Sequence, residues 1–151
     1  LTLEGKKMFK KTLICVVLAV LSGCEDSNDL SNKIKPAEVE SNKSATAVYF
    51  PGGGLDFNRI PVSDNSKNDE SGAHIGSINF AFDDGMEKIS ELISPVMIAQ
   101  GYTEIKRTHT NCKLCMVYSK NKVEIAFAYN PVSREGLDNG STLLIWWKDK
   151  K

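Results

Sequence analysis

The fold is decided by residues 116–129, which read MVYSKNKVEIAFAY. Side chains two positions apart on a strand share a face, so two strands align their faces when they pair. Pairing Tyr118 with Val123 around Lys120-Asn121 predicts an antiparallel hairpin. In that register the larger side chains share the expected core face: Met116, Tyr118, Val123, Ile125, Phe127 and Tyr129.

The other face of this hairpin carries smaller and partly polar side chains, which are Cys115, Val117, Glu124, Ala126 and Ala128. A surface of this composition does not need to be buried inside the same domain. We therefore expect it to accept either a partner or a covering loop.

The apolar run TLLIWW, residues 142–147, predicts a further strand that is covered on both sides. Adjacent residues of a regular strand point to opposite faces, so Trp146 and Trp147 are expected to separate. One would cap the core beneath a helix. The other would pack beneath the 48–72 segment, which we favour, or serve as a contact anchor on the small-residue face, because aromatic side chains dominate interface energies.

Upstream of the hairpin, residues 77–82 alternate as a strand, and a helix is expected after them. Asp84 is the expected N-cap, and Glu87, three residues later, completes a capping box. The apolar residues that follow recur at the helical period, which predicts one buried stripe. Its members are Met86, Ile89, Leu92, Ile93, Val96 and Met97.

The end of this helix is marked by two residues with special backbones. Pro95 has no amide proton to donate, so a kink is expected, or a restart with Ser94 as cap. Gly101 is expected to end the helix in the left-handed conformation. Residues 102–108 then read as a strand near a sheet edge, because polar residues lie on both of its faces.

The remaining segments of the domain have weak patterns. Residues 48–50 predict a short strand that the loop 51–54 stops, residues 63–72 a solvated loop, and residues 130–141 a long turn-rich connection. Residues 47–151 are thus expected to form a single globular α+β domain. Its mainly antiparallel sheet, of about 4-5 strands, would pack against one main helix.

The start of the chain has the pattern of an export signal. Met8-Phe9-Lys10-Lys11 is basic, residues 12–20 are apolar, and Leu21-Ser22-Gly23-Cys24 follows. The apolar run is shorter than the roughly 20 residues that span a bilayer. The last four residues match the lipobox of bacterial lipoproteins, and the leader resembles their signal peptides. This resemblance implies removal of residues 1–23, a diacylglycerol on Cys24, and a membrane-anchored, periplasm-facing protein of the cell envelope.

Loss of residues 1–23 would remove four lysines and one glutamate, leaving 15 basic and 18 acidic residues. A formal charge near −3 offers no basic stripe, so we expect no binding to nucleic acid. Residues 25–46 are rich in Ser, Asn, Asp, Glu and Lys. Because such a segment buries little apolar surface, residues 24–46 are expected to form a flexible tether behind the lipidated cysteine.

Cys112 and Cys115 are the cysteines that remain after Cys15 in the leader and Cys24 at the lipid. A disulfide is the first expectation in an oxidising compartment. A metal site made by His109, Cys112 and Cys115, with His74 as fourth ligand, is a second reading. Redox catalysis by the cysteine pair is a third. Covalent haem attachment would need a histidine after Cys115, where the chain has Met116.

No motif of a known catalytic class is found, and we expect neither an enzyme nor a cofactor beyond the lipid on Cys24. The hypothesis from the sequence is an envelope lipoprotein whose domain is a small protein-binding module. An immunity or inhibitor protein fits this description, and so does an accessory subunit of an envelope machine. The alternative is an extracytoplasmic thiol-disulfide or metal-binding protein that uses Cys112 and Cys115.

Overall fold

The structure, a computed structural model, describes residues 34–38, 43–134 and 137–149. Its strands and its helix follow in chain order: β1 (Lys35–Pro36), β2 (Ala47–Phe50), β3 (Gly53–Asp56), β4 (Ser63–Asp64), β5 (Lys67–Asn68), β6 (His74–Phe82), α1 (Met86–Ala99), β7 (Thr103–His109), β8 (Cys112–Lys120), β9 (Val123–Arg134) and β10 (Leu137–Lys148).

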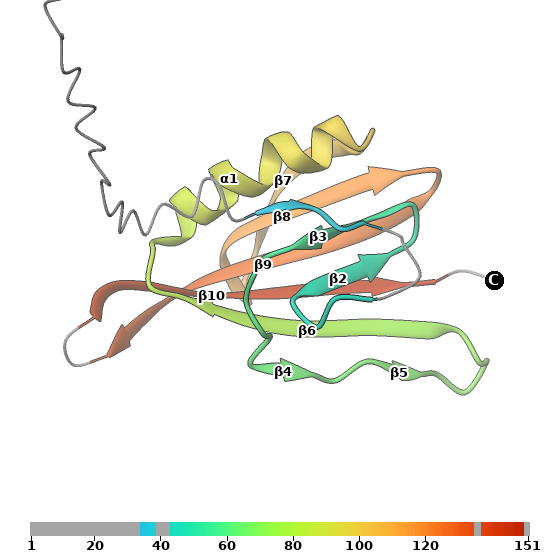
Figure 1. Cartoon of the computed structure of the whole chain (residues 1–151), viewed down its shortest axis with the longest axis horizontal. Coiled ribbons are helices and arrows are strands. Elements are labelled where there is room, and N and C mark those ends of the chain that lie inside the picture. Colours follow the sequence, from blue (N-terminus) through green and yellow to red (C-terminus); the bar gives the residue numbers. More distant parts are fainter. Residues whose placement is uncertain (1–33, 39–42, 135–136, 150–151) are drawn as a thin grey trace, which may run out of the picture.

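Two antiparallel sheets and the helix form the architecture. A seven-stranded sheet has the order β4-β6-β10-β9-β8-β7, with β5 also paired to β6, and a three-stranded sheet has the order β1-β3-β2. Figure 1 shows α1 and the small sheet on the same side of the large sheet. The prediction of an α+β fold with mainly antiparallel pairing is confirmed, but the expected number of strands is too low. Four additional strands are found, and three of them, β1, β4 and β5, have two residues each, too short to show a period.

The central hairpin is formed by β8 and β9, and its register differs from the prediction. Tyr118 lies opposite Ile125 and Lys120 opposite Val123. The turn is Asn121-Lys122, with φ angles of 50° and 66°. Because the true register differs from the predicted one by two residues, every side chain keeps its predicted face. Four of the predicted core residues are accordingly fully buried, namely Tyr118, Ile125, Phe127 and Tyr129.

The long connection expected over 130–141 is wrong, because β9 and β10 continue as a hairpin to Arg134 and from Leu137. Pro131 made this segment look like a turn. Beyond Tyr129, however, β9 has no pairing with β8. A proline is tolerated where a strand has a free side, since no ladder hydrogen bond is lost there.

Helix α1 buries the predicted stripe, with Ile89, Ile93 and Met97 fully enclosed. The predicted capping box is absent, because Gly85 is the N-cap and makes no side-chain hydrogen bond to the helix. Asp84 instead pairs with Lys88 Nζ at 2.7 Å. The helix also continues through Pro95, so the restart expected at Ser94 does not occur.

The end of α1 was predicted correctly. Gly101 has φ 86°. The Gly101 amide donates to the Ile98 carbonyl and the Tyr102 amide to the Met97 carbonyl, which is a Schellman motif. Lys120 Nζ donates to the carbonyl oxygens of Gln100, at 2.7 Å, and of Gly52, at 3.0 Å. A cation at a helix C-terminus is favourable, so the β8-β9 hairpin also supports the helix end.

The glycines at 52–54 do not form the expected loop, since Gly53 and Gly54 belong to β3. Gln100 lies against this strand: its Oε1 accepts from the Gly54 amide and its Nε2 donates to the Gly54 carbonyl, both at 3.1 Å. A Cβ atom on Gly53 would collide with Gln100 Oε1. The small sheet is therefore held to the end of α1 by direct side-chain to backbone contact.

The tether predicted over 24–46 is wrong for its described residues. Ile34 and Ala37 are buried, and β1 pairs with β3. Ser44 and Thr46 lie in a hydrogen-bonded turn. The domain therefore includes residues 34–38 and 43–46, ahead of the expected boundary at 47. Cys24 and the export signal lie outside the described residues. Within those residues, no helix has the length and apolar character that a membrane crossing requires.

Candidate functional site: the open face of the large sheet

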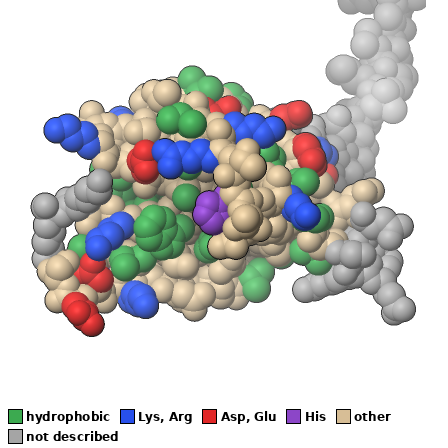
Figure 2. Space-filling model, turned by 180° about the vertical axis from the view of Figure 1, so that it is seen from behind, with side chains coloured by type: hydrophobic (Ala, Val, Ile, Leu, Met, Phe, Trp, Pro, Cys, Tyr) green, Lys and Arg blue, Asp and Glu red, His purple; other side chains and the backbone are tan. Residues whose placement is uncertain are grey.

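The open face is the side of the large sheet opposite α1 and the small sheet. Figure 2 shows this side, where hydrophobic side chains lie among basic and acidic ones. A groove of about 400 Å³ crosses it, lined by Arg107, His109, Asn111, Cys112, Cys115, Met116, Val117, Ala126, Phe127, Ala128, Leu144 and Trp146.

The strand registers explain why the groove forms on this face. Strand β9 contributes only alanine at the centre, while the neighbouring strands contribute larger side chains, so the sheet surface is lowest along β9. Two cross-strand rows build the groove: Trp146–Ala126–Val117–Ile105 and Leu144–Ala128–Cys115–Arg107. The small-residue face expected from the sequence is thus the floor of a depression.

The two tryptophans of β10 separate as their spacing predicts. Trp147 is 2% exposed and packs edge-on against Phe50 of the small sheet, with ring centroids 6.0 Å apart. Trp146 is 43% exposed. The expectation that both faces of this strand are covered is therefore wrong. The segment before β6 covers Trp147, and Trp146 is left on the open face.

Cys112 and Cys115 lie at disulfide distance at the start of β8, with Cα atoms 5.8 Å apart. Three residues of a regular strand span about 10 Å, so the backbone between the cysteines is not regular. Arg107 lies opposite Cys115 and His109 opposite Cys112, so three steps on β8 face two on β7. The cysteine pair thus closes a β-bulge.

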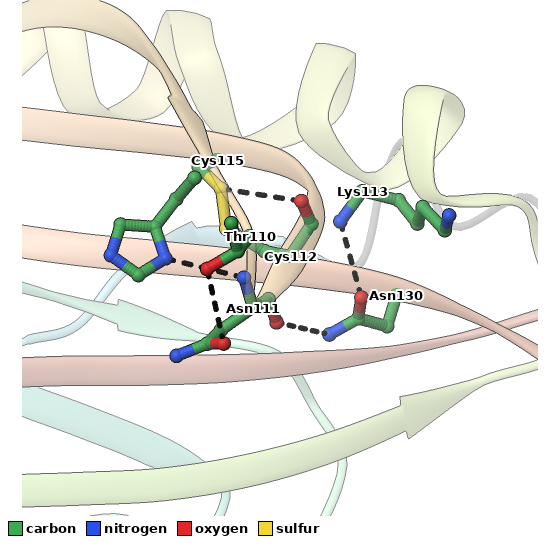
Figure 3. The surroundings of a disulfide bond; sticks show 7 residues. Thr110, Asn111, Cys112, Lys113, Cys115 and Asn130 are labelled. Atoms are coloured by element: carbon green, nitrogen blue, oxygen red, sulfur yellow. Dashed lines mark hydrogen bonds between the residues drawn. A yellow bond between two sulfur atoms is a disulfide. The ribbon is translucent and has the colours of Figure 1, made fainter.

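The bulge is held from β9 by Asn130, as Figure 3 shows. The Asn130 Oδ1 accepts from the Lys113 amide at 3.1 Å, and its Nδ2 donates to the Asn111 carbonyl at 3.4 Å. One side chain therefore fixes the chain on both sides of Cys112. This role could not be predicted from the sequence, because asparagine is common in turn-rich segments.

Of the four residues in the metal-site interpretation, His109, Cys112 and Cys115 line the same groove, but His74 lies far from them. His109 is exposed, and its Nδ1 accepts from the Asn111 amide at 3.2 Å. His74 starts β6 and packs against Trp147, whereas Cys115 is level with Asn79, three strands away. Strand geometry puts His74 roughly 20 Å from Cys115. Among the described residues, no group of three or more His, Cys, Asp or Glu is arranged to hold a metal.

Charge on the open face is concentrated at its β7 side. Arg107 Nη2 lies 3.2 Å from Glu124 Oε1, and both side chains are about half exposed. An ion pair this exposed contributes little to stability. Because Arg107 of β7 reaches Glu124 on β9, its aliphatic stem crosses the intervening strand β8. The groove therefore combines an apolar floor with a margin at which Arg107 pairs with Glu124.

Tyrosine hydroxyls lie on the core side of the same strands. The Tyr118 hydroxyl donates to Glu104 Oε2 at 2.7 Å. Burial raises the pKa of Tyr118 and of Tyr129, and it raises the pKa of Tyr102 to about 12. These groups keep their protons at neutral pH and support the fold.

Comparison of the chain with protein-family models, with curated proteins and with solved structures finds no significant match.

Proposed function

We propose that this protein is an envelope lipoprotein, held at a membrane by a lipid on Cys24, whose domain binds a protein partner through the open face. The observation that carries the proposal is Trp146, a tryptophan 43% exposed at the side of an apolar groove. A contiguous exposed apolar patch rimmed by polar residues commonly marks a site of protein interaction. The lipobox supports the envelope location.

The shape of the groove suggests how a partner would bind. Its floor is alanine, so an apolar side chain of the partner can reach the backbone of β9 and pack against Trp146. A buried aromatic anchor surrounded by weaker contacts is the usual energetic centre of a protein interface. The groove offers few polar groups to orient a small polar substrate. An inhibitor of an enzyme delivered to the envelope, or an accessory subunit, would use such a surface.

The binding proposal is tested by photo-crosslinking in envelope vesicles. A photoreactive phenylalanine analogue replaces Trp146 in one variant and Ile98 in another. Ile98 is the matched control, because it is also exposed and lies on α1 in the other layer. We expect a discrete adduct from position 146 and none from position 98. We also expect Trp146→Ala to weaken binding of the identified partner at least tenfold. Equal crosslinking at both positions would contradict the proposal.

The anchor is tested separately with Cys24→Ser and metabolic labelling by an alkyne fatty acid. The wild-type chain should take up the label and appear in the membrane fraction. The variant should remain unlabelled, with its leader uncleaved. A variant that is still processed and labelled would show that the lipobox was misread.

A second candidate is a thiol-disulfide protein, which one observation favours: Cys112 and Cys115 both line the groove. A reacting thiol would be reachable there from a bound partner. Free-thiol titration and metal analysis of the purified protein separate the two proposals. Two free thiols, together with loss of function in Cys112→Ser but not in Trp146→Ala, would favour the thiol protein.

A further inference from the structure

The two edges of the large sheet are treated differently. At one edge, β6 is covered by the short strands β4 and β5, which pair with it in succession. At the other edge, β7 pairs with β8, and no further strand follows in the described residues. Strand β7 has seven residues, of which all except Glu104 are exposed. A long uncovered edge offers unpaired backbone groups to another chain.

Strand β7 also borders the open face. Ile105, which ends the row that starts at Trp146, is 41% exposed. A strand added beside β7 would place every second side chain on the open face, next to Ile105 and Arg107. The edge and the groove are therefore parts of one continuous surface.

The charge of this edge is positive. Lys106 and Arg107, the latter paired with Glu124, lie along it, and Lys113 follows at the start of β8. The only acidic residue of β7 is Glu104, and it accepts a hydrogen bond from the Tyr118 hydroxyl. A carboxylate on an added strand would thus meet cations, while a basic strand would be repelled.

We infer that the protein partner supplies an extended acidic segment that pairs with β7 and continues the large sheet. This inference rests on the proposed function, and it specifies how the partner binds. Backbone hydrogen bonds to β7 would give the segment its alignment, and its acidic side chains would pair with Lys106, which lies on the opposite face of β7 from Ile105. Its apolar side chains, at alternate positions, would cover Ile105 and extend the apolar floor of the groove.

A second copy of this chain fits the edge less well. If two β7 strands paired about a two-fold axis at Lys106, the two copies of this lysine would lie directly opposite each other. Like charges directly across a strand pair are destabilising. The charge of β7 therefore disfavours self-association and favours a partner of opposite sign.

The test uses the full-length protein in detergent and three synthetic seven-residue peptides. The first alternates glutamate with valine, the second alternates lysine with valine, and the third is the acidic peptide with N-methyl groups on alternate amides. N-methylation prevents strand pairing and leaves the side chains unchanged. We expect the acidic peptide alone to bind, and to slow hydrogen exchange at β7 amides and not at β4 or β5.

A matched pair of variants sharpens the test. Lys106→Glu on β7 should weaken the acidic peptide about tenfold. Lys67→Glu on β5, at the covered edge, is the control and should leave binding unchanged. Both lysines are exposed, so neither substitution should impair folding.

Three outcomes would overturn the inference: no binding of the acidic peptide at millimolar concentration, equal binding of its N-methylated form, or equal effects of the two variants. None of them contradicts the proposed function, because that is tested by the crosslink at Trp146. Conversely, if position 146 gave no crosslink but the acidic peptide still paired with β7, the partner would bind at the edge of the sheet and not in the groove.

Discussion

Trp146 and Trp147 are neighbours on the same strand, and only the face they occupy distinguishes them. Trp147 lies against Phe50 and above Gly76, where a Cβ atom would collide with its ring. Trp146 lies opposite Ala126 on the neighbouring strand and is 43% exposed. The core face is closed by a second layer that fits it closely, whereas the open face has no such layer in the described structure. Whether a tryptophan of this strand is buried therefore depends on whether a second layer covers its face of the sheet.

The largest expected effect is the loss of Trp147. Trp147→Ala leaves a cavity between β6, β10 and the small sheet, and should lower the free energy of unfolding by about 3 to 5 kcal/mol. Trp146→Ala, the matched control, should lower it by less than about 1 kcal/mol, since its ring makes fewer contacts. Chemical denaturation of both variants measures the difference. Equal losses would show that the open face is also part of the core.

The next effect is the response of the core tyrosines to alkali. The pKa of Tyr102 is raised from 10.0 to about 12, so the folded state retains a proton that the unfolded state releases. Stability from this group is complete below pH 10 and is lost as the pH rises toward 12, on the order of 3 kcal/mol. We expect cooperative unfolding in this range. The ultraviolet absorbance of phenolate should rise together with the loss of structure, and an earlier rise in the folded state would contradict the prediction.

The cysteine pair should contribute less. Closing so short a loop restricts the unfolded chain only slightly, so replacing both Cys112 and Cys115 by Ser should cost at most about 2 kcal/mol. The consequence should be local, because Asn130 still bridges the bulge. Hydrogen exchange should increase around 109–115 and remain unchanged in α1. Global destabilisation beyond this figure would place the bulge in the core.

The smallest expected effect concerns the turn that connects β8 and β9. Lys122 has φ 66°, a conformation that costs a lysine roughly 1 kcal/mol and a glycine almost nothing. Lys122→Gly should therefore raise the free energy of unfolding by up to about 1 kcal/mol, measured by thermal denaturation. Asn121→Gly should change it less, because asparagine tolerates the left-handed conformation. A loss of stability in Lys122→Gly would show that its side chain makes contacts that outweigh the strain.

The sequence predicted the two faces because the strand period alone assigns side chains to them. The hairpin register was wrong by two residues, and the assignment of Phe127 and Ala128 was unaffected. The helix stripe and Gly101 were predicted for the same reason: each depends on a local repeat or on a single backbone requirement.

The sequence did not predict the contacts between segments far apart in the chain. Strands β1, β4 and β5 have two residues each, and they form only because β3 or β6 offers them an edge. The hydrogen bonds between Gln100 and Gly54 join residues 46 positions apart. The exposure of Trp146 likewise depends on which segment covers which tryptophan. These contacts depend on tertiary packing between distant segments, which produces no repeating pattern in a single sequence.

The strand order of the large sheet has a consequence for the order of folding. Strands β7 to β10 form a meander in which each strand pairs with the next, so these contacts close short loops. Strand β6 pairs with β10 across the helix and the whole meander. Contacts between distant segments form slowly, because closing a long loop costs more entropy. When the chain is synthesised from its N-terminus, the edge of β6 that pairs with β10 therefore stays uncovered until the last strand has been made.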